Sequence, residues 1–459
     1  MPPRHNSLSV TLRIAAIVAI AWLLLQPAGS DPGWTVRVRA AETFVQILVQ
    51  EFTKVPFRSN GSPARLNAIA HTGNQMFVVT SDEGKIYEII AGETYLWFDV
   101  KKALGDKLRS GGAEGGLRSL AFHPDYASNG KFYTSEIQER QTASSKVRYL
   151  SDPDTPTRND SVVTEWTRHP DGSFSGPREV LRIGTPGPHT IKQIIFNPYL
   201  APGDEHYGLL YIAHGDGGEW PSPLGGHNNN ALGKILRIDP LESDGKAYSV
   251  PVDNPFVGDP NMLDEVYAIG LRCPHNLAFS RDGKLLAAEM GNKNVEEVNV
   301  ITAGGDYGWK AREGTFTYLD AVRGAGIDSL PTDDEGHRYT YPAAQIVHDP
   351  AYSGGIAIAG GYPIENSSDL DGLYIYGEFA TTGVIYYSSM AEMAEATTVG
   401  PPELLTQAET RIAQIIFDHD RDPRTPPQVK TSMLDVINDS PHYAAGNTRA
   451  DIRFGQGPA

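Results

Sequence analysis

The chain has 459 residues, 40% of them hydrophobic, and it is rich in glycine (47) and proline (33). This length suits one large domain or a few ordinary ones, and the composition excludes a largely disordered chain. The formal net charge of −17 argues against nucleic acid as a partner, because phosphate binding needs a basic surface.

The first 30 residues have the pattern of a secretory signal peptide. Arg4 and Arg13 give a basic start, and Ile14–Leu25 is an unbroken apolar run. That run is shorter than the ~20 residues of a transmembrane helix, so we expect a signal peptide over residues 1–30, with cleavage as late as residue 41. The protein is then secreted or periplasmic, with no integral span in the mature chain. An uncleaved N-terminal membrane anchor is the alternative.

Residues 43–459 are expected to form a single all-β domain. Short apolar runs recur in pairs, joined by polar turns such as Asn129-Gly130 and Asp282-Gly283. The predicted strand pairs are Leu66–Ile69 with Met76–Val79, Leu120–Pro124 with Phe132–Tyr133, Ile194–Pro198 with Leu209–Ile212, and Leu277–Phe279 with Leu285–Ala288. Tandem antiparallel pairs indicate a β-propeller, and a β-sandwich is the alternative.

Helices are expected to be few and short, the clearest being Ser389–Ala396. Long loops rich in Asp, Pro, Thr and Gly are expected at residues 150–175 and 310–340. A propeller closes its last blade against its first, and the chain stops four residues after Gly455. We therefore expect either that strands near residues 43–52 close the ring or that the sequence is truncated.

His189 and Asp216 form the clearest candidate for proton abstraction. His189 lies in the segment Gly187-Pro-His-Thr190, and Asp216 lies in Tyr211–Gly218, which is rich in glycine. A neutral imidazole accepts a proton near pH 7, and a carboxylate holds its tautomer and stabilises the imidazolium. An ordinary loop histidine and a turn aspartate are the alternative interpretation of these two residues.

Further motifs extend in a fixed order from about residue 60 to the C-terminus. They are Glu114–Leu117, Leu120–Asp125, Tyr211–Gly218, Leu232–Pro240, Asp253–Phe256, Tyr267–Pro274, Glu296–Asn299, Gly304–Trp309, Gly360–Tyr362 and Tyr374–Phe379. In this order they resemble the soluble PQQ-dependent glucose/sorbosone (aldose sugar) dehydrogenases, whose relatives include Hedgehog-interacting protein. The resemblance implies a six-bladed β-propeller of four-stranded antiparallel blades with long inserted loops.

The resemblance also implies an activity and the residues that carry it. The activity is PQQ- and calcium-dependent oxidation of the C1 hydroxyl of an aldose sugar to a lactone, with electrons passed to an external acceptor. His189 matches the catalytic base, Asp216 its carboxylate partner, and Arg272 the group that stabilises negative charge on the quinone. Glu114, Arg272, Cys273 and Lys192 are the expected cofactor-binding residues.

Calcium is the metal that the resemblance implies. The carbonyls of Gly291 and Asn292 match those that hold the cofactor calcium, and the Glu297 carboxylate and Tyr307 carbonyl match a second, structural site. Oxygen ligands of this kind suit a hard cation. Trp309, which follows these motifs, is expected to be a core-packing residue.

The chain departs from the family pattern where PQQ carboxylates meet basic residues. Glu365, Thr381 and Thr382 stand where the family often has Lys or Arg, and Cys273 replaces the usual asparagine. Either other cations, such as Lys192, bind the PQQ carboxylates or PQQ does not bind. As the only cysteine, Cys273 cannot form an internal disulfide and is expected to be buried.

Two other functions stay open at this point. One is a non-catalytic propeller that binds a protein or carbohydrate partner, which the lost basic positions favour. The other is a calcium-dependent, lactonase-like hydrolase in which the same histidine–aspartate pair activates water. Turnover of a lactone without PQQ separates the hydrolase from the dehydrogenase.

Overall fold

The computed structural model describes residues 45–455 apart from 74, 82, 112–113, 141–158, 219–228, 320–325, 335–337, 349–355, 366–368, 380, 419–423 and 441–445. The predicted signal segment, residues 1–30, lies outside the described residues. Within the described part, no helix has the length and apolarity needed to cross a membrane.

Five four-stranded antiparallel sheets hold most of the described strands. The first contains β2 (Leu66–Thr72), β3 (Gln75–Thr80), β4 (Lys85–Ile90) and β5 (Glu93–Asp99), and the second β6 (Leu117–Phe122), β7 (Lys131–Glu139), β8 (Asn159–Arg168) and β9 (Phe174–Thr185). The third contains β10 (Ile191–Phe196), β11 (Leu210–His214), β12 (Lys234–Ile238) and β13 (Val266–Ala268), and the fourth β14 (Pro274–Phe279), β15 (Leu285–Glu289), β16 (Val295–Ile301) and β20 (Ala344–Val347). The fifth contains β21 (Ile358–Pro363), β22 (Leu373–Glu378), β23 (Ile385–Ser389) and β24 (Arg411–Ile412).

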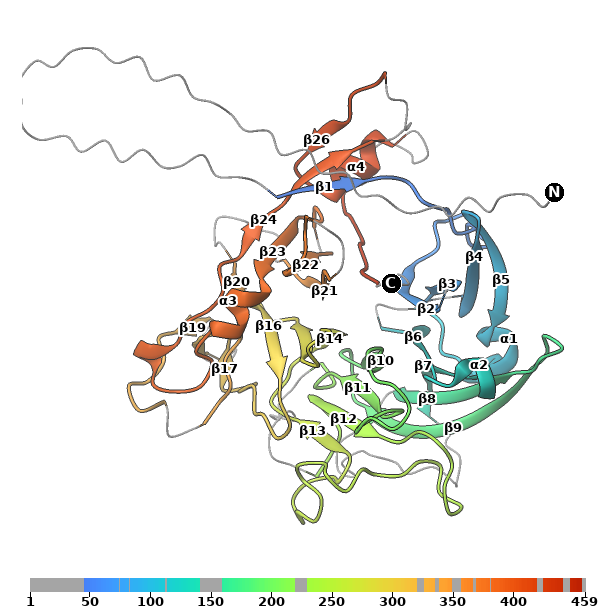
Figure 1. Cartoon of the computed structure of the whole chain (residues 1–459), viewed down its shortest axis with the longest axis horizontal. Helices are drawn as coiled ribbons and strands as arrows, with labels where there is room; N and C mark the ends of the chain where they lie inside the picture. The colour runs from blue at the N-terminus through green and yellow to red at the C-terminus, as the bar shows by residue number, and fades with distance from the viewer. Residues whose placement is uncertain are drawn as a thin grey trace, which may run out of the picture.

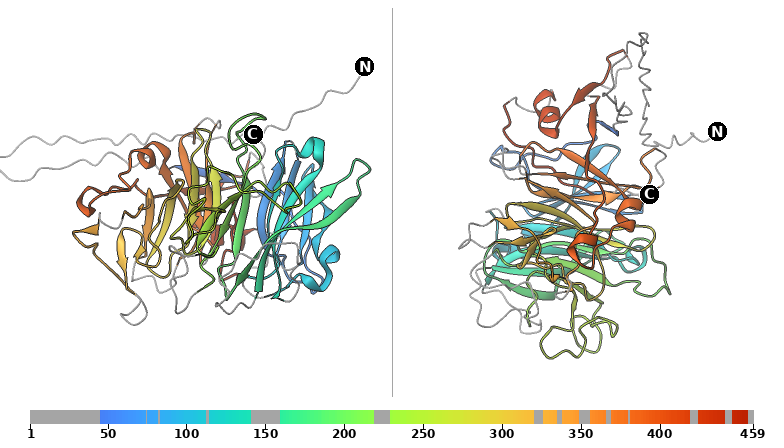
Figure 2. Two further views of the ribbon diagram at one scale, coloured as in Figure 1. Left: turned by 90° about the horizontal axis from the view of Figure 1, so that it is seen from below. Right: turned by 90° about the vertical axis from the view of Figure 1, so that its left-hand side faces the viewer.

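These sheets follow one another in chain order around a central axis, with the first strand of each sheet innermost (Figure 1). Strand β10 packs against β6 and β14, β6 packs against β2, and β14 packs against β21. The strands run along the short dimension of the molecule (Figure 2). Sheets in radial repetition make a β-propeller, whereas a β-sandwich would stack only two sheets face to face.

The four predicted strand pairs are confirmed. They correspond to the antiparallel pairs β2–β3, β6–β7, β10–β11 and β14–β15. The predicted helix Ser389–Ala396 is also confirmed as α3 (Met390–Glu395), where the Ser389 side chain accepts a hydrogen bond from the Glu392 N–H. The other helices within the described residues are the short α1 (Val100–Leu104), α2 (Tyr126–Asn129) and α4 (Met433–Asp439), with 3-10 turns at Gly105–Lys107 and Pro402–Leu404.

The two predicted long loops are partly wrong. The described part of residues 150–175 contains β8, whose segment Val162-Val-Thr-Glu-Trp166 is rich in the β-branched and aromatic residues that favour strands. Within residues 310–340, the short strands β17 (Arg312–Glu313), β18 (Phe316–Tyr318) and β19 (Ile327–Asp328) form a small antiparallel sheet. The Asp- and Pro-rich composition of both segments therefore led to a loop prediction where strands are present.

The hydrophobic core lies between consecutive sheets. Clusters of buried side chains join the first sheet to the second, the second to the third, the third to the fourth and the fourth to the fifth. Trp166, 2% exposed, belongs to the cluster between the first and second sheets. Each sheet thus buries apolar surface mainly against its neighbours in the ring.

A three-stranded sheet of β1 (Gln46–Val49), β25 (Gln414–Phe417) and β26 (Gln428–Lys430) follows the fifth sheet. Strand β1 pairs in parallel with β25, so residues within the predicted range 43–52 do join the last sheet. The final described segment, residues 446–455, then runs toward the axis (Figure 1), where the Ala450 N–H donates to the Thr381 carbonyl at 2.8 Å.

Candidate active site

His189 lies at the end of the ring where the inner strands begin. Its loop joins β9 to β10, and its φ of 62° is left-handed, a conformation that is uncommon for residues other than glycine and frequent at functional sites. The Nδ1 atom of His189 lies 2.7 Å from Oδ1 of Asp216, and the His189 side chain is 13% exposed. The structure therefore brings together the two residues of the predicted proton-abstraction pair.

Burial and hydrogen bonding set the protonation of this pair. Burial lowers the pKa of His189 below its usual value, although the hydrogen bond and charge of Asp216 act in the opposite sense. Burial would raise the pKa of Asp216, but the contact with His189 and the charge of Arg272 hold it below its ordinary range. At neutral pH the pair is thus a neutral imidazole on a carboxylate, with Nδ1 donating and Nε2 left as the basic nitrogen.

Glycine at position 215 is required by a close approach between the two loops. A Cβ at Gly215 would lie 2.5 Å from the carbonyl oxygen of His189 and 2.6 Å from its Cβ. The Gly217 N–H also donates to the His189 carbonyl at 3.3 Å. The glycine-rich sequence around Asp216 therefore lets its backbone lie directly against the histidine loop.

Trp309 holds the same carboxylate from its other side. Its indole Nε1–H donates to Oδ2 of Asp216 at 2.8 Å, and its backbone N–H donates to the Gly270 carbonyl at 2.8 Å. The sequence predicted only core packing for Trp309. The position of Trp309 directly after a Gly-Gly-Asp-Tyr-Gly turn was the available signal that its indole reaches toward the site.

Arg272 lies beside this unit, with its guanidinium 5.6 Å from the Trp309 ring centroid. Its carbonyl accepts the Asp216 N–H at 2.7 Å, which ties the two loops together. Its Nη1 donates to the Gly291 carbonyl at 2.5 Å, and Nη2 lies 3.3 Å from Oδ1 of Asn292. The Gly291 carbonyl, predicted to bind calcium, therefore contacts a guanidinium, so a cation there would share that oxygen with Arg272.

Lys192 and Glu114 form an ion pair next to His189. The Lys192 Nζ lies 2.5 Å from Oε2 of Glu114, and the Thr190 hydroxyl donates to the same oxygen at 3.1 Å. Burial would raise the pKa of Glu114, but Lys192 and Arg118 together hold it well below its ordinary range. Both predicted pocket residues therefore lie next to His189, and Glu114 is a carboxylate at neutral pH.

Cys273 is fully buried, as expected from the sequence. Burial raises the pKa of its thiol to about 12, so the thiol is neutral and unreactive at physiological pH. Its backbone N–H donates to Oε1 of Glu289 at 2.5 Å, as does the N–H of Arg272 at 2.7 Å. Glu289 thereby fixes the backbone that carries Arg272.

Glu297 faces Glu289 across neighbouring strands. The two residues are register partners in β15 and β16, and both are buried. Burial raises the pKa of Glu297 to about 7, and burial together with the charge of Glu297 raises that of Glu289 well above its usual value. Oε1 of Glu297 accepts the Gly314 N–H at 2.6 Å. The hydroxyl of Tyr307 donates to the Val300 carbonyl at 2.7 Å, and the Tyr307 carbonyl stays a predicted metal ligand.

A family model described as Glucose / Sorbosone dehydrogenase matches residues 63–422. The chain belongs to the glucose/sorbosone dehydrogenase family. The resemblance stated from the motifs is therefore confirmed.

The curated proteins that are similar to this chain carry different kinds of name. The HIPL1 protein of Arabidopsis thaliana is 30% identical over 314 residues, covering 59% of this chain and 44% of that protein. Quinoprotein glucose dehydrogenase B of Acinetobacter calcoaceticus is 27% identical over 315 residues, covering 65% of this chain and 58% of that protein. The match thus spans only about half the length of these relatives.

Among solved structures, the PQQ-bound form of aldose sugar dehydrogenase (Adh) from Streptomyces coelicolor superposes with a TM-score of 0.51 at 19% identity. The superposition covers 87% of this chain and 94% of that one. At this identity the likeness establishes the fold of the family and not the activity of this chain.

Glu365 does not face the site, which corrects the expectation from the family pattern. Both of its carboxylate oxygens accept the Arg281 N–H at 2.9 Å. Arg281 follows the end of β14, whereas Arg272 precedes its start, so a strand of six residues separates Glu365 from the site. The negative charge of Glu365 is therefore no obstacle to an anionic cofactor.

Thr381 and Thr382 do lie at the site end of the ring. Their hydroxyls donate to Oε1 of the buried Glu378 at 2.9 and 3.3 Å. These two positions therefore supply hydroxyl groups and no positive charge at this end of the ring. A cation that the sequence analysis did not single out lies nearby, because the Arg449 Nε donates to the Phe379 carbonyl at 3.2 Å and its guanidinium lies over the Phe379 ring.

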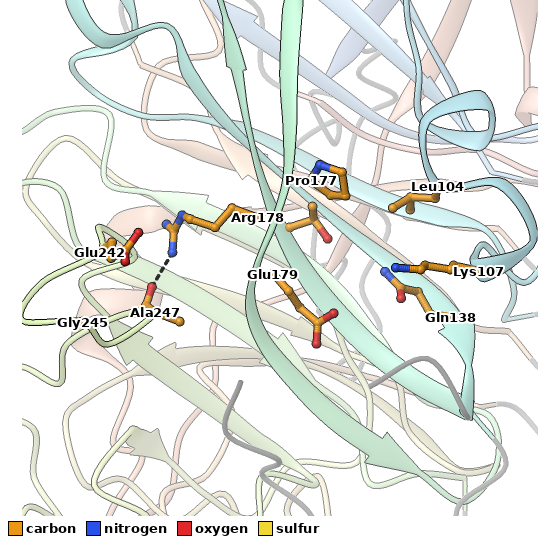
Figure 3. Close-up of a pocket in the computed structure, with 10 residues that line it drawn as sticks. Leu104, Lys107, Gln138, Pro177, Arg178, Glu179, Glu242, Gly245 and Ala247 are labelled. Atoms are coloured by element: carbon orange, nitrogen blue, oxygen red, sulfur yellow. Dashed lines mark hydrogen bonds between the residues drawn. The ribbon is translucent and has the colours of Figure 1, made fainter. Parts of the chain in front are cut away.

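Two other features of the described surface lie apart from this site. Glu205, His206 and Asp253 form a group with metal-ligand spacing, but the Arg237 guanidinium already lies 2.8 Å from an Asp253 oxygen. A hollow of about 330 Å³ lies between β9 and residues 242–247, and Arg178 donates there to the Ala247 carbonyl at 2.7 Å. Figure 3 shows residues that line it. None of the predicted site residues lines this hollow.

Proposed function

We propose that this protein is a sugar dehydrogenase that oxidises the C1 hydroxyl of an aldose to a lactone and passes the electrons to an external acceptor. The observation that carries the proposal is the hydrogen-bonded unit of His189, Asp216 and Trp309, with Arg272 beside it. A relative named a quinoprotein and a neighbour solved in a PQQ-bound form support PQQ as the cofactor.

The chemistry of the chain's own residues follows from this geometry. The basic Nε2 of His189 takes the proton of the sugar C1 hydroxyl, and Asp216 stabilises the imidazolium that forms. Arg272 supplies a fixed positive charge where negative charge develops during oxidation. Bound PQQ supplies the group that accepts the hydride from C1.

The cations around the site suit an anionic cofactor. PQQ has three carboxylates, and Lys192, Arg272 and Arg449 are among the basic groups that the structure describes at this end of the ring. They take the place of the family cations that are missing at Thr381 and Thr382. We propose that Arg272 and Lys192, with Glu114 as the counter-charge of Lys192, line the cofactor pocket.

Calcium belongs to the same proposal. Among the described residues none donates a hydrogen bond to Oε2 of Glu289, which is buried and opposite Glu297. A divalent cation near this carboxylate pair would remove the unfavourable burial of like charges. Glu297 is therefore the better-supported metal ligand. A cation at the Gly291 carbonyl would share that oxygen with Arg272, and Asn292 and Tyr307 stay predictions.

The blade count and the location of the protein are also proposals. We propose that the three-stranded sheet of β1, β25 and β26 is the sixth blade of a six-bladed propeller spanning residues 43–459. An exported location, secreted or periplasmic, rests on the signal pattern of residues 1–30 alone.

A non-catalytic binding propeller is the second candidate, and one observation favours it. Lys192, two residues after Thr190, is already paired with Glu114 at 2.5 Å, so its charge is partly neutralised before any cofactor binds. Binding of an unmodified sugar or a protein without PQQ, together with no dye reduction, is the result expected of this candidate. Lactone hydrolysis without PQQ would instead indicate the hydrolase.

The test is an equilibrium titration of PQQ into the purified full chain, with and without calcium. Native protein should bind PQQ saturably and in a calcium-dependent manner, and should then reduce a dye with at least one aldose. His189→Ala should still bind PQQ but lose about 10²- to 10⁴-fold in turnover, the usual contribution of a general base. Absence of PQQ binding by a folded native chain would refute the proposal.

A further inference from the structure

Side chains from all five inner strands line a hollow at the axis of the propeller. They include the second residue of each inner strand, and segment 446–455 adds another; these are Asn67, Arg118, Lys192, His275, Ala359 and Arg453. These residues surround a hollow of about 20 Å³. His189, Asp216 and Arg272 do not line this hollow, whereas Lys192 borders both the hollow and the proposed cofactor pocket.

Three of these side chains are buried cations with too few partners. Lys192 Nζ lies 2.5 Å from Oε2 of Glu114, and Arg118 Nη2 lies 4.0 Å from the same oxygen. Arg453 Nη1 lies 2.7 Å from Oδ1 of Asp451. Three cations thus face two carboxylates, which leaves one positive charge in excess.

The second carboxylate is itself shared. Asp451 is 37% exposed and also lies 3.9 Å from Nε of Arg65 and 3.5 Å from Nη2 of Arg449. Its charge is therefore divided among several guanidinium groups and partly screened by solvent. The excess of positive charge at the axis is at least as large as the simple count indicates.

His275 adds no negative charge, and its pKa is affected by all three cations. Burial lowers its pKa well below the usual value, and the charges of Arg453, Lys192 and Arg118 act in the same sense. The ring is therefore neutral, and its Nδ1 lies 2.8 Å from the Ala359 carbonyl, to which it donates.

The Arg118 side chain gives the most direct indication that a hydrogen-bond acceptor is missing at the axis. It is 8% exposed, and its Nε is buried; within the part of the chain that the structure describes, no group accepts a hydrogen bond from that atom. Burying a charged donor without an acceptor is costly, and natural structures rarely leave it so.

We propose that the axial hollow binds one small inorganic anion, chloride or an ion of similar size, between Arg118, Lys192 and Arg453. A hollow of about 20 Å³ exceeds the roughly 10–15 Å³ that one water-sized particle requires. It is too small for a tricyclic cofactor or a sugar acid. A water molecule could accept the Arg118 hydrogen bond, but only an anion also offsets the excess charge.

Bromide is the probe, because its anomalous scattering identifies it and it needs neither PQQ nor sugar. Crystals of the full chain grown without halide and soaked in bromide should show an anomalous peak among Arg118, Lys192 and Arg453. In solution, the Tm should rise saturably with sodium chloride or bromide, and not with sodium methanesulfonate at equal ionic strength. No peak and equal Tm curves in the two anions would overturn the proposal and indicate water.

Matched variants tie the effect to the axis. Arg118→Met keeps the length of the side chain without its charge and should lose the halide-dependent rise in Tm. Arg411→Met removes a partly exposed arginine paired with Glu392 and Glu409 and should keep that rise. A halide effect that survives Arg118→Met would contradict the site, and if that variant does not fold, the anomalous peak in the native protein decides the outcome.

Discussion

The indole Nε1–H of Trp309 donates to Oδ2 of Asp216 at 2.8 Å, while Nδ1 of His189 lies 2.7 Å from the other oxygen, Oδ1. The Asp216 carboxylate is thus fixed from two sides. The backbone N–H of Asp216 also donates to the Arg272 carbonyl. A carboxylate held in this way fixes both the tautomer and the ring direction of the histidine. Trp309 is therefore a positioning residue for the proposed base.

Trp309→Phe keeps an aromatic ring and removes the donor to Asp216. A hydrogen bond to a charged group contributes about 1.5–3 kcal/mol, so we expect kcat to fall about ten- to a hundredfold with little change in PQQ affinity. Steady-state dye reduction and PQQ titration measure the two quantities. Trp97→Phe, in the aromatic cluster of the first sheets, is the control and should leave kcat unchanged. Equal losses in both variants would indicate a general packing effect.

Asp216→Asn should change the pH profile as well as the rate. Burial lowers the pKa of His189, and Asp216 is the main influence that raises it. The native enzyme should therefore lose activity on the acid side with an apparent pKa below 6.5, and the variant should lose it at still lower pH. Its maximal rate should fall by about 10²-fold or more because the imidazolium is no longer stabilised. An acid limb that moves to higher pH would show that Asp216 does not contact the base.

Glu136 provides a test of stability against pH, away from the site. It is fully buried in β7, and its carboxylate accepts hydrogen bonds from Thr134, Thr164 and Gln138. Burial raises its pKa from 4.5 to about 7. The folded state thus holds this proton up to about pH 7, so the contribution to stability is complete below pH 4.5 and is lost as pH rises through 7.

Glu136→Gln should remove that dependence. The free energy of unfolding should vary less between pH 5 and pH 8 in the variant, by at most about 3 kcal/mol. Denaturant unfolding at the two pH values measures this difference. Glu93→Gln, on the exposed start of β5, should follow the native dependence. A native protein whose stability does not fall between pH 5 and pH 8, with the variant unchanged, would rule out a neutral Glu136.

The strand pairs and the contact between His189 and Asp216 were predictable because their signals are local. Gly- and Asp-containing turns between apolar runs fixed the pairs, and family motifs placed His189 and Asp216 on loops that the fold does bring together. The parallel pairing of β1 with β25 was anticipated only as one of two outcomes, because it joins segments separated by most of the chain.

The cations of the axis were not predictable from the sequence. Arg118 lies in a strand whose side chains alternate between faces, and Arg453 lies in a segment without regular secondary structure. Only the packing of the inner strands and of that segment decides which side chains meet the axis. Glu365 was wrongly placed near the cofactor for the same reason, since motif spacing does not say at which end of a strand a residue lies. The Trp309 hydrogen bond likewise depends on two loops separated by most of two sheets.

Gly270 offers a test of how the backbone positions the site. Its φ is 75°, and a Cβ there would lie 2.7 Å from the Gly308 nitrogen and 2.8 Å from the Tyr307 nitrogen. Gly270→Ala therefore adds a backbone clash to the cost of a left-handed alanine, about 1–2 kcal/mol. Because the Gly270 carbonyl accepts the Trp309 N–H at 2.8 Å, the displacement should also reach Asp216.

Gly283→Ala separates strain from clash. Gly283 has a φ of 87°, but no atom lies within 4 Å of a Cβ built there. We expect a small fall in Tm for Gly283→Ala, and for Gly270→Ala a fall several times larger, accompanied by a loss of dye reduction that the first variant does not show. Thermal unfolding and turnover measure both. Similar falls in Tm would mean that the segment from Asp306 to Trp309 yields easily, and the close packing would then not be what holds Trp309 against Asp216.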